Sequence, residues 1–416
     1  MEYDLGFAKT TVKVNIDDKN LIGIFHANKV KVKLTGASEV KRALENPIGT
    51  KKLYEIVKPG EKIAVITSDI TRPMPSRTVL PIVLEELYRA GVKNEDITIV
   101  FALGSHRKQT EEEKRYLVGE DIYNKINCID SDSNDFAHLG YTDNNTPVDI
   151  FTPVVKADRR ICLGNIEYHY FAGYSGGAKA IMPGVSTREA IQANHSRMVE
   201  EAAHAGNIIT NPVRKDIEDA IKFIPIDFIV NVVLDEKKEI IKAVAGDYID
   251  AHREGCRFLD SFYKIPFKEK ADIVVTSIGG YPKDINLYQA QKALDNAKYA
   301  VKKAGIIILV ASCREGLGEK TFEEWLLKAK DPEELIEKIK SNFKLGGHKA
   351  AAIAMVLQNA KVFLVSELNP KLVKDIFLEP FNDVQSALDY AYKEMGEDAK
   401  VILIPNGGSI LPILEK

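Results

Sequence analysis

The feature that most constrains the fold is an alternation of short β-branched runs with helical patterns. In the first half of the chain, these runs are KIAVIT (62–67), DITIVFAL (96–103) and RRICLG (159–164). The first two are followed by segments with helical character, and the third by a glycine-rich loop. Strands that alternate with helices predict a mostly parallel sheet covered by helices, so the sequence predicts an α/β fold.

A second series of strand-like runs begins near residue 271 with DIVVTSIGG and continues with GIIILVAS, KVFLVSEL and KVILIPNGG. The polar, proline-containing stretch 263–270 separates the two series, which predicts a domain boundary there. We therefore expect an N-terminal α/β domain over 1–266 and a C-terminal α/β domain over 267–416. The segments TVKVNID and KVKLTG are expected to add antiparallel strands to the first domain.

Composition narrows the class of protein. The 416 residues are 45% hydrophobic and 28% charged, which is typical of a globular protein with a buried core. The formal net charge of -3 gives no electrostatic reason for a nucleic-acid partner. The start MEYDLGFAKT has no signal-peptide pattern, and no apolar run approaches the roughly 20 residues of a membrane span, so we expect a cytoplasmic protein without membrane contact. The four cysteines form no CxxC pair and are expected to be buried thiols.

Ligands of open parallel sheets bind beyond the carboxyl ends of the strands, so the loops that follow the predicted strands should carry the chemistry. Those loops are SDITRPMPS, GSHRKQT, NIEYHYFAGYSGGAKAIMPGVS and IGGYPKDINLYQAQKAL. Each of them carries ionisable side chains, which makes them the place to search for a site.

The loop GYSGGAKAIMPG centres on Lys179. It departs from a P-loop, because Ala178 stands where the last glycine belongs and Ala180 replaces the Ser or Thr, so a Walker-type NTPase is disfavoured. A lysine among glycines suits phosphate pairing or a covalent bond to a cofactor, since glycine lets the backbone approach a ligand closely. An exposed loop lysine is the alternative.

His195 lies on the helix that follows this loop. Ser186 and Glu189 predict a capping box at the start of that helix. His195 shares one face with the apolar residues of the helix at steps of three and four, which predicts that it points inward. An inward histidine is either a hydrogen-bonded core residue or a metal ligand.

His106 and His169 both follow predicted strands. Two imidazoles that face one cleft could act as the acid and base of a racemase or epimerase. Together with His195 they could instead form a three-histidine zinc site for hydrolysis. A structural role for either ring is a further alternative, because the spacing of the histidines in the sequence does not distinguish between these roles.

Two further pairs carry charge near strand ends. Asp69 could fix an imidazole or a ribose hydroxyl, and Arg72 could hold a carboxylate or phosphate, or the two could form a loop-stabilising pair. Gln289 and Lys292 share a face of a helix expected to begin near Asp284. They could present an amide and an ammonium to a small carboxylate, or form a solvated face.

In chain order, SDITRP, GSHR, EYHYFAGYSGGAK, PG, NH and GYPKDINLYQAQK resemble the nickel-dependent lactate racemase family over about residues 69 to 292. The resemblance implies a cofactor, a pyridinium dithiocarboxylate mononucleotide (the nickel-pincer nucleotide), joined covalently to a lysine and holding nickel(II). By motif match, Lys179 is the attachment point and His195 is the nickel ligand. Residues 1–266 would then be the cofactor-binding domain, with the active site in the interdomain cleft.

The resemblance also implies roles for the other candidates. The acid/base pair would be His106 and His169. Cofactor contacts would come from the loop after the first strand, at Asp69, Ile70, Thr71 and Arg72. Contacts to the substrate carboxylate would come from the later helix, at Tyr288, Gln289 and Lys292. The implied reaction is a hydride shuttle: one histidine removes the hydroxyl proton while the α-hydride moves to the pincer ring, and the hydride returns to the opposite face of a transient keto acid.

The implied activity is racemisation of a 2-hydroxy acid, with lactate as the family default. Another 2-hydroxy acid or a sugar is a same-class alternative, and the three-histidine zinc hydrolase is a different enzyme class. A carrier protein for the nickel nucleotide is the non-enzymatic alternative. The implied partners are the small 2-hydroxy acid and the cofactor-building enzymes that supply the nucleotide.

Overall fold

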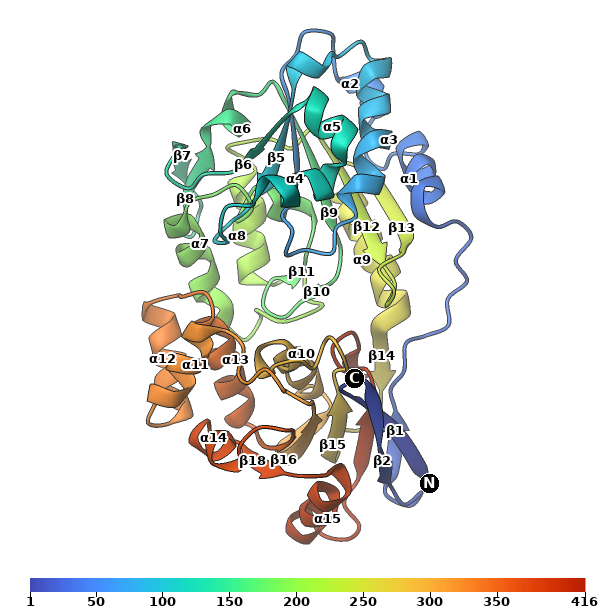
Figure 1. The fold of residues 1–416 in the computed structure, drawn as a ribbon, viewed down its shortest axis with the longest axis vertical. Coiled ribbons are helices and arrows are strands. Elements are labelled where there is room, and N and C mark those ends of the chain that lie inside the picture. The colour runs from blue at the N-terminus through green and yellow to red at the C-terminus, as the bar shows by residue number, and fades with distance from the viewer. Residues whose placement is uncertain (416) are drawn as a thin grey trace. The chain divides into compact units, whose positions relative to one another are not determined.

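The computed structural model describes residues 1–415 and divides into two compact units. One, here called the continuous unit, is Val30–Ser261. The other, here called the split unit, combines Met1–Lys29 with the chain from Phe262 onward. Each unit is built around its own six-stranded sheet with flanking helices, so the predicted α/β class with two sheets is confirmed (Figure 1).

The sheet of the continuous unit has the order β13-β12-β9-β4-β5-β6. All neighbouring pairs are parallel except β12 with β13, which is antiparallel. The three predicted strands of this unit are confirmed within a residue or two. The strands are β4 (Ile63–Ser68), β5 (Ile97–Ala102), β6 (Asn127–Asp130), β9 (Arg159–Asn165), β12 (Phe228–Leu234) and β13 (Ile240–Gly246).

This strand order places a switch point in the sheet. From β4 the chain adds β5 and β6 on one side, and it then returns to add β9 and β12 on the other side. The loops that leave β4 and β9 therefore diverge, and such a point is where open α/β sheets bind ligands. The loop after β4 begins at Asp69 and the loop after β9 at Ile166.

Short hairpins and helices surround this sheet. The hairpins are β7 (Phe136–Tyr141) with β8 (Pro147–Phe151) and β10 (Tyr168–His169) with β11 (Gly173–Tyr174). The helices are α1 (Gly36–Glu45), α2 (Leu53–Ile56), α3 (Ser76–Arg89), η1 (Asn94–Asp96), α4 (Glu111–Val118), α5 (Glu120–Lys125), α6 (Thr152–Lys156), η2 (Gly177–Ala180), α7 (Arg188–His195), η3 (Ser196–Val199), α8 (Pro212–Ala220) and α9 (Asp250–Tyr263).

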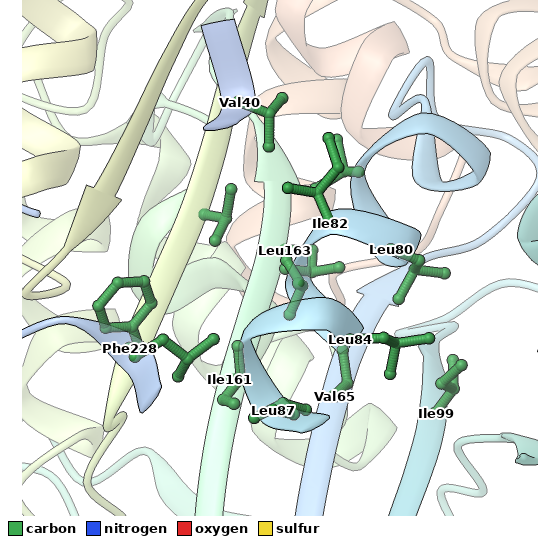
Figure 2. Packing of buried hydrophobic residues seen from close by; sticks show 14 of the residues in the cluster. Val40, Val65, Leu80, Ile82, Leu84, Leu87, Ile99, Ile161, Leu163 and Phe228 are labelled. Carbon is green, nitrogen blue, oxygen red and sulfur yellow. The ribbon is translucent and has the colours of Figure 1, made fainter. Parts of the chain in front are cut away.

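The core of the continuous unit lies between the sheet and α3. Figure 2 shows Leu84 and Leu87 of α3 beside strand residues such as Val65. These side chains are at most 3% exposed, so each contributes roughly 1.5–3 kcal/mol through burial of apolar surface. This packing fixes the strand ends from which the candidate site projects.

The sheet of the split unit has the order β18-β17-β16-β15-β19-β3, and every neighbouring pair is parallel. Its strands are β3 (Leu21–Ile24), β15 (Ala271–Ser277), β16 (Val301–Val310), β17 (Ala360–Val365), β18 (Glu379–Phe381) and β19 (Val401–Ile404). Here β15 and β19 flank the switch point. Two further pairs are β1 (Glu2–Phe7) with β2 (Thr10–Asn15) and β14 (Lys264–Phe267) with β20 (Leu411–Leu414). The helices are α10 (Leu287–Ala297), α11 (Lys320–Lys328), α12 (Pro332–Ser341), α13 (Gly347–Leu357), α14 (Pro370–Asp375) and α15 (Val384–Met395).

The N-terminal segment differs from the prediction. The stretch TVKVNID does form an antiparallel strand, β2, but residues 30–35 form no strand. Leu5, Val14 and Ile16 are at most 1% exposed and pack in the core of the split unit, while β3 pairs with β19. Met1–Lys29 therefore lies with the C-terminal part of the chain, whereas the prediction placed it in a domain over 1–266.

Within the described residues 1–415, none of the helices combines the length and apolar character that crossing a bilayer requires.

Candidate active site

Asp69 and His106 form a hydrogen-bonded pair at the carboxyl ends of the adjacent strands β4 and β5. The Oδ2 atom of Asp69 lies 2.5 Å from Nδ1 of His106, and the Asp69 side chain is 2% exposed. A carboxylate can only accept, so Nδ1 of His106 carries the shared proton and the lone pair of the neutral ring is on Nε2. Asp69 therefore fixes the orientation and the tautomer of the His106 ring.

The loop around Asp69 is held by its own hydrogen bonds. The Oδ1 atom of Asp69 accepts from the Thr71 hydroxyl at 2.6 Å and the Thr71 amide at 3.0 Å, and the Ile70 amide donates to Gln109 at 2.8 Å. Burial raises the pKa of Asp69, but the hydrogen bonds from His106 and Thr71 and the positive charge of Arg72 more than offset it, so the pKa is lowered. Asp69 is thus a charged, fixed acceptor.

His169 lies on the β10–β11 hairpin, and its hydrogen bond selects the tautomer opposite to that of His106. Its Nδ1 atom accepts a hydrogen bond from the backbone amide of Ala172 at 3.2 Å, so the proton of the neutral ring is on Nε2. Burial lowers the pKa of His169 well below its ordinary value, and the charges of Lys179, His195 and Arg72 lower it further. His169 is therefore a neutral ring near neutral pH.

Lys179 lies in the short helix η2 within the predicted glycine-rich loop, and its side chain is half-buried. Burial lowers the pKa of Lys179 well below its ordinary value, and the nearby guanidinium groups of Arg214 and Arg72 add to the effect. A lowered pKa raises the share of the neutral amine, which is the nucleophilic form of lysine.

His195 is the last residue of α7 and is 8% exposed, so the prediction that it points inward is confirmed. Its Nδ1 atom lies 2.9 Å from Oδ1 of Asn194. The amide nitrogen of Asn194 donates to Val213 and Asp216, which leaves its oxygen for His195. Nδ1 of His195 therefore carries the proton and Nε2 the lone pair. This tautomer is usual in a metal-ligating histidine, whose other ring nitrogen donates to a neighbouring acceptor.

The start of α7 differs from the predicted capping box. Thr187 is the N-cap, and its hydroxyl accepts from the Ala190 amide at 3.2 Å. The Ser186 hydroxyl instead donates to the carbonyl of Ile181 at 3.0 Å. The helix thus begins one residue later than the pattern indicated, because Ser186 is used to close the preceding loop.

The ring of Phe171 connects two of the candidates. It makes edge contacts with His169, at 4.5 Å between ring centroids, and with His195, at 4.8 Å. Since Lys179 and Arg72 also act on the pKa of His169, these groups gather around one place in the continuous unit. Within residues 1–415, no three His, Cys, Asp or Glu side chains form a group that could hold a metal, so His106, His169 and His195 do not make a three-histidine site.

The donor set that is present suits the implied nickel nucleotide better than a bare metal ion. One buried imidazole, His195, offers a single nitrogen ligand, and Lys179 offers an amine with a lowered pKa for attachment. A soft-leaning nickel(II) centre accepts one imidazole when the remaining ligands come from sulfur and carbon of a cofactor. The residues therefore fit the group.

The candidates in the split unit lie on α10, which follows β15. This helix begins at Leu287, with Asn286 as the N-cap, rather than near Asp284 as predicted. Gln289 and Lys292 are exposed, and Tyr288 is half-buried with its ring edge against Phe322. The buried Asp284 fixes the approach to the helix, since its carboxylate accepts from the amides of Ala8 at 2.6 Å and Ser312 at 3.1 Å.

Sequence reasoning missed three buried polar residues that surround the Lys179 loop: Arg214, Asn231 and His252. All are at most 1% exposed, and they come from α8, β12 and α9. No motif of the sequence pointed to any of the three. Their contacts are with backbone atoms of the loop, which no side-chain pattern reveals.

Comparison with known proteins shows a match to both halves of one family. Residues 7–206 match the lactate racemase N-terminal domain, and residues 267–412 match the lactate racemase C-terminal domain. A lactate racemase of Thermoanaerobacterium thermosaccharolyticum is 36% identical, covering 98% of this chain and 98% of the relative. A lactate racemase of Lactiplantibacillus plantarum is 35% identical, covering 98% of this chain and 99% of the relative.

Solved structures agree with the sequence relatives. The lactate racemase apoprotein from T. thermosaccharolyticum is similar with a TM-score of 0.90 at 35% identity, covering 99% of this chain and 100% of that chain. A Thermotoga maritima protein is similar with a TM-score of 0.66 at 18% identity, covering 92% of this chain and 100% of that chain, which shows a shared fold alone.

Proposed function

Because the chain belongs to the lactate racemase family and is therefore an isomerase, we propose that it racemises a 2-hydroxy acid, with lactate as the substrate. The observation that carries this proposal is the arrangement at the switch point of the continuous unit. There, one lysine with a lowered pKa and two histidines held in opposite tautomers lie on loops at the carboxyl ends of the strands. Such an arrangement suits removal and return of the proton of the substrate hydroxyl group.

The family is nickel-dependent, and we propose that this chain uses the nickel-pincer nucleotide. Lys179 would carry it covalently, His195 would bind nickel through Nε2, and the loop Asp69–Arg72 would contact the nucleotide. When bound, the group supplies an acceptor for the hydrogen of the substrate α-carbon. Everything else in the reaction falls to the side chains of the protein.

The two histidines would handle the hydroxyl proton. His106 presents the lone pair of Nε2 and is backed by the charged Asp69, which stabilises the imidazolium that forms when His106 takes a proton. His169 presents an N–H at Nε2 and donates a hydrogen bond toward the substrate oxygen. When hydrogen returns to the α-carbon, the imidazolium of His106 would give its proton back to the substrate oxygen, while the Nε2–H of His169 would continue to donate a hydrogen bond to that oxygen.

Substrate orientation would come from α10. Lys292 would pair with the substrate carboxylate, Gln289 would donate an amide hydrogen bond to it, and Tyr288 would lie beside them. A carboxylate held by a charged and a neutral donor fixes the substrate in a reactive geometry, which replaces a loose encounter by an oriented one.

The test is to produce the chain together with the cofactor-building enzymes and to measure its intact mass and its racemase activity. We expect a mass gain located in the peptide that contains Lys179, and interconversion of D- and L-lactate. Active protein with unmodified Lys179 would overturn the cofactor assignment.

A panel of chiral 2-hydroxy acids and sugars distinguishes lactate from other substrates. A preference for a larger acid or a sugar would keep the chemistry and replace the substrate. Cofactor loading without turnover of any member of the panel would instead indicate a carrier.

A further inference from the structure

The stretch from Ala172 to Gly177, which leads directly to Lys179, has little regular secondary structure beyond the two-residue strand β11 and the start of η2. Gly173, Gly176 and Gly177 have φ angles of 77°, 76° and 59°, in the left-handed region that favours glycine. Such a loop turns its carbonyl groups in several directions, and buried carbonyls need donors. A glycine-rich loop would also leave the Lys179 side chain poorly placed unless something outside the loop fixes it.

Arg214 of α8 supplies most of the missing donors. Its side chain is fully buried, and its guanidinium group donates to the carbonyls of Ala172 at 3.3 Å, Gly176 at 3.4 Å and Tyr174. The planar fork of arginine can serve several acceptors at once, which a lysine ammonium does with less directional control. Three carbonyls of the loop thus converge on one side chain.

Asn231 of β12 and His252 of α9 each bind one further backbone group of the loop. The Oδ1 atom of Asn231 accepts from the Gly177 amide at 2.7 Å, and Nε2 of His252 donates to the Ser175 carbonyl at 2.7 Å. Arg253 donates to Nδ1 of His252 at 3.0 Å, which keeps the proton on Nε2. The donor and acceptor assignments are therefore mutually consistent.

The loop also fits closely onto these side chains. A Cβ atom at Gly176 would lie 2.7 Å from Oδ1 of Asn231, and one at Gly177 would lie 2.9 Å from Cγ of His252. Both distances are shorter than real Cβ contacts allow. The glycines are thus required by close approach as well as by their φ angles.

We propose that Arg214, Asn231 and His252 form a clamp that fixes the loop Ala172–Gly177 and thereby places the Lys179 amine for reaction, with Arg214 as the principal positioning residue. This inference rests on the proposed function only in its choice of Lys179 as the reacting amine. The clamp acts on the chain before any cofactor is present. It can therefore be examined in the apoprotein.

The charge of Arg214 adds a second effect. The guanidinium group of Arg214 donates to backbone carbonyls. The Glu218 carboxylate lies 4.0 Å from it, but both oxygens of that carboxylate accept from Arg253, at 2.8 and 2.9 Å. A positive charge therefore stays buried behind the loop. Three charged or titratable groups interact electrostatically with Lys179: Arg214 from α8, Arg72 from the loop after β4 and His169 from β10. Burial lowers the pKa of Lys179 most, and Arg214 comes next.

The experiment measures the reactivity of Lys179 in apoprotein by trace labelling with acetic anhydride between pH 6 and 10, followed by peptide mass spectrometry. The pH midpoint of labelling reports the charge on the amine, and the plateau rate reports its accessibility. The variants are Arg214→Met and Arg214→Lys. The matched control is Lys215→Met, which removes an exposed charge from the same helix.

We expect Arg214→Met to raise the midpoint by about one pH unit, which is about a tenfold loss of labelling at pH values below both midpoints. Arg214→Lys should restore most of the shift, and Lys215→Met should leave the midpoint unchanged. A midpoint that does not move in Arg214→Met, or that moves equally in Lys215→Met, overturns the proposal.

A second variant keeps the proposal testable if Arg214→Met does not fold. Asn231→Ala removes the acceptor of the Gly177 amide without changing any charge, so hydrogen exchange of that amide should accelerate at least about tenfold while the Lys179 midpoint stays in place. Unchanged exchange overturns the clamp. Because both measurements use apoprotein, they can fail while cofactor attachment at Lys179 stands, and the mass gain at Lys179 can fail while the clamp stands.

Discussion

The two sheets of the molecule share one architecture but place different side chains at their switch points. Both are six-stranded and mostly parallel. In both, the chain first adds strands on one side of a central strand and later adds strands on its other side. At the switch point of the continuous unit, the candidate groups are buried or half-buried, held by specific partners, and several have shifted pKa values. On α10 of the split unit, Gln289 and Lys292 are exposed polar side chains.

This difference indicates a division of labour. Groups that exchange protons or form covalent bonds need a defined tautomer and a tuned pKa, which require burial and partners. Groups that bind a small carboxylate need reach and charge, which an exposed side chain on the first turns of a helix provides. The experiments below test whether the division holds.

The largest effect should come from the two histidines. In protein loaded with cofactor, His106→Ala and His169→Ala should each lower kcat by about 10²–10⁴-fold, because each removes a proton acceptor or donor. Chiral chromatography of lactate measures the loss. His138→Ala is a matched control, since His138 pairs with Asp149 in the same unit without entering the candidate site. Racemisation that persists in either variant would assign the proton transfer elsewhere.

A smaller effect is expected from Asp69→Asn. The amide can no longer hold the Nδ1 proton of His106 as a charged acceptor, so we expect kcat to fall about 100-fold with little change in KM. The mass gain at Lys179 should remain. Loss of that mass gain would instead mean that the contact of Asp69 with the cofactor is needed for attachment at Lys179.

The exposed helix α10 should respond differently. Lys292→Met should raise KM about tenfold and change kcat much less, because it removes a pairing of charges made in the ground state as well as in the transition state. Lys303→Met, an exposed charge removed from β16, is the control. If kcat falls and KM stays constant, Lys292 takes part in the chemistry and the division of labour fails.

The smallest effect concerns stability at mildly acidic pH. Burial lowers the pKa of His252 well below 6.5, so the folded state keeps this ring neutral while the unfolded state binds a proton below about pH 6.5. The free energy of unfolding should therefore fall as the pH drops through 6.5, by roughly 1 kcal/mol at pH 5.5 from this residue. Urea unfolding at pH 7.5 and 5.5 should show a flatter dependence in His252→Gln, but not in His26→Gln. An equal dependence in both would mean that His252 is charged in the fold.

The predictions from sequence succeeded where a local pattern of residues is typical of one structure. Runs such as RRICLG predict β9 because a parallel strand is buried on both faces and shows a continuous apolar signal. The inward position of His195 followed from helical spacing, and the loop positions of Asp69 and His106 from the ends of the strands. The roles of Lys179 and His195 came from the ordered motifs and stay proposals.

The parts that could not be predicted depend on distant pairing. The residues LIGI (21–24) carry no pattern that predicts their pairing with β19. Likewise, the Asn20 amide group donates to the carbonyl of Glu397, which lies 377 residues along the chain. Arg214 and His252 were missed for a related reason. Their partners are backbone carbonyls, which every residue has and which therefore leave no mark in the sequence.

The pairing of β3 with β19 has a consequence during synthesis. The N-terminal strands leave the ribosome first, but the strand beside which β3 lies is translated almost last. The continuous unit can complete its sheet in the meantime, since domains generally fold as units as they emerge. β3 must therefore remain unpaired until β19 is made, whereas Leu5 and Val14 can pack against β15 and β16 once those strands have formed. A stop codon shortly before Val401 would remove β19, so β3 would lack its partner and one edge of β15 would be left unpaired.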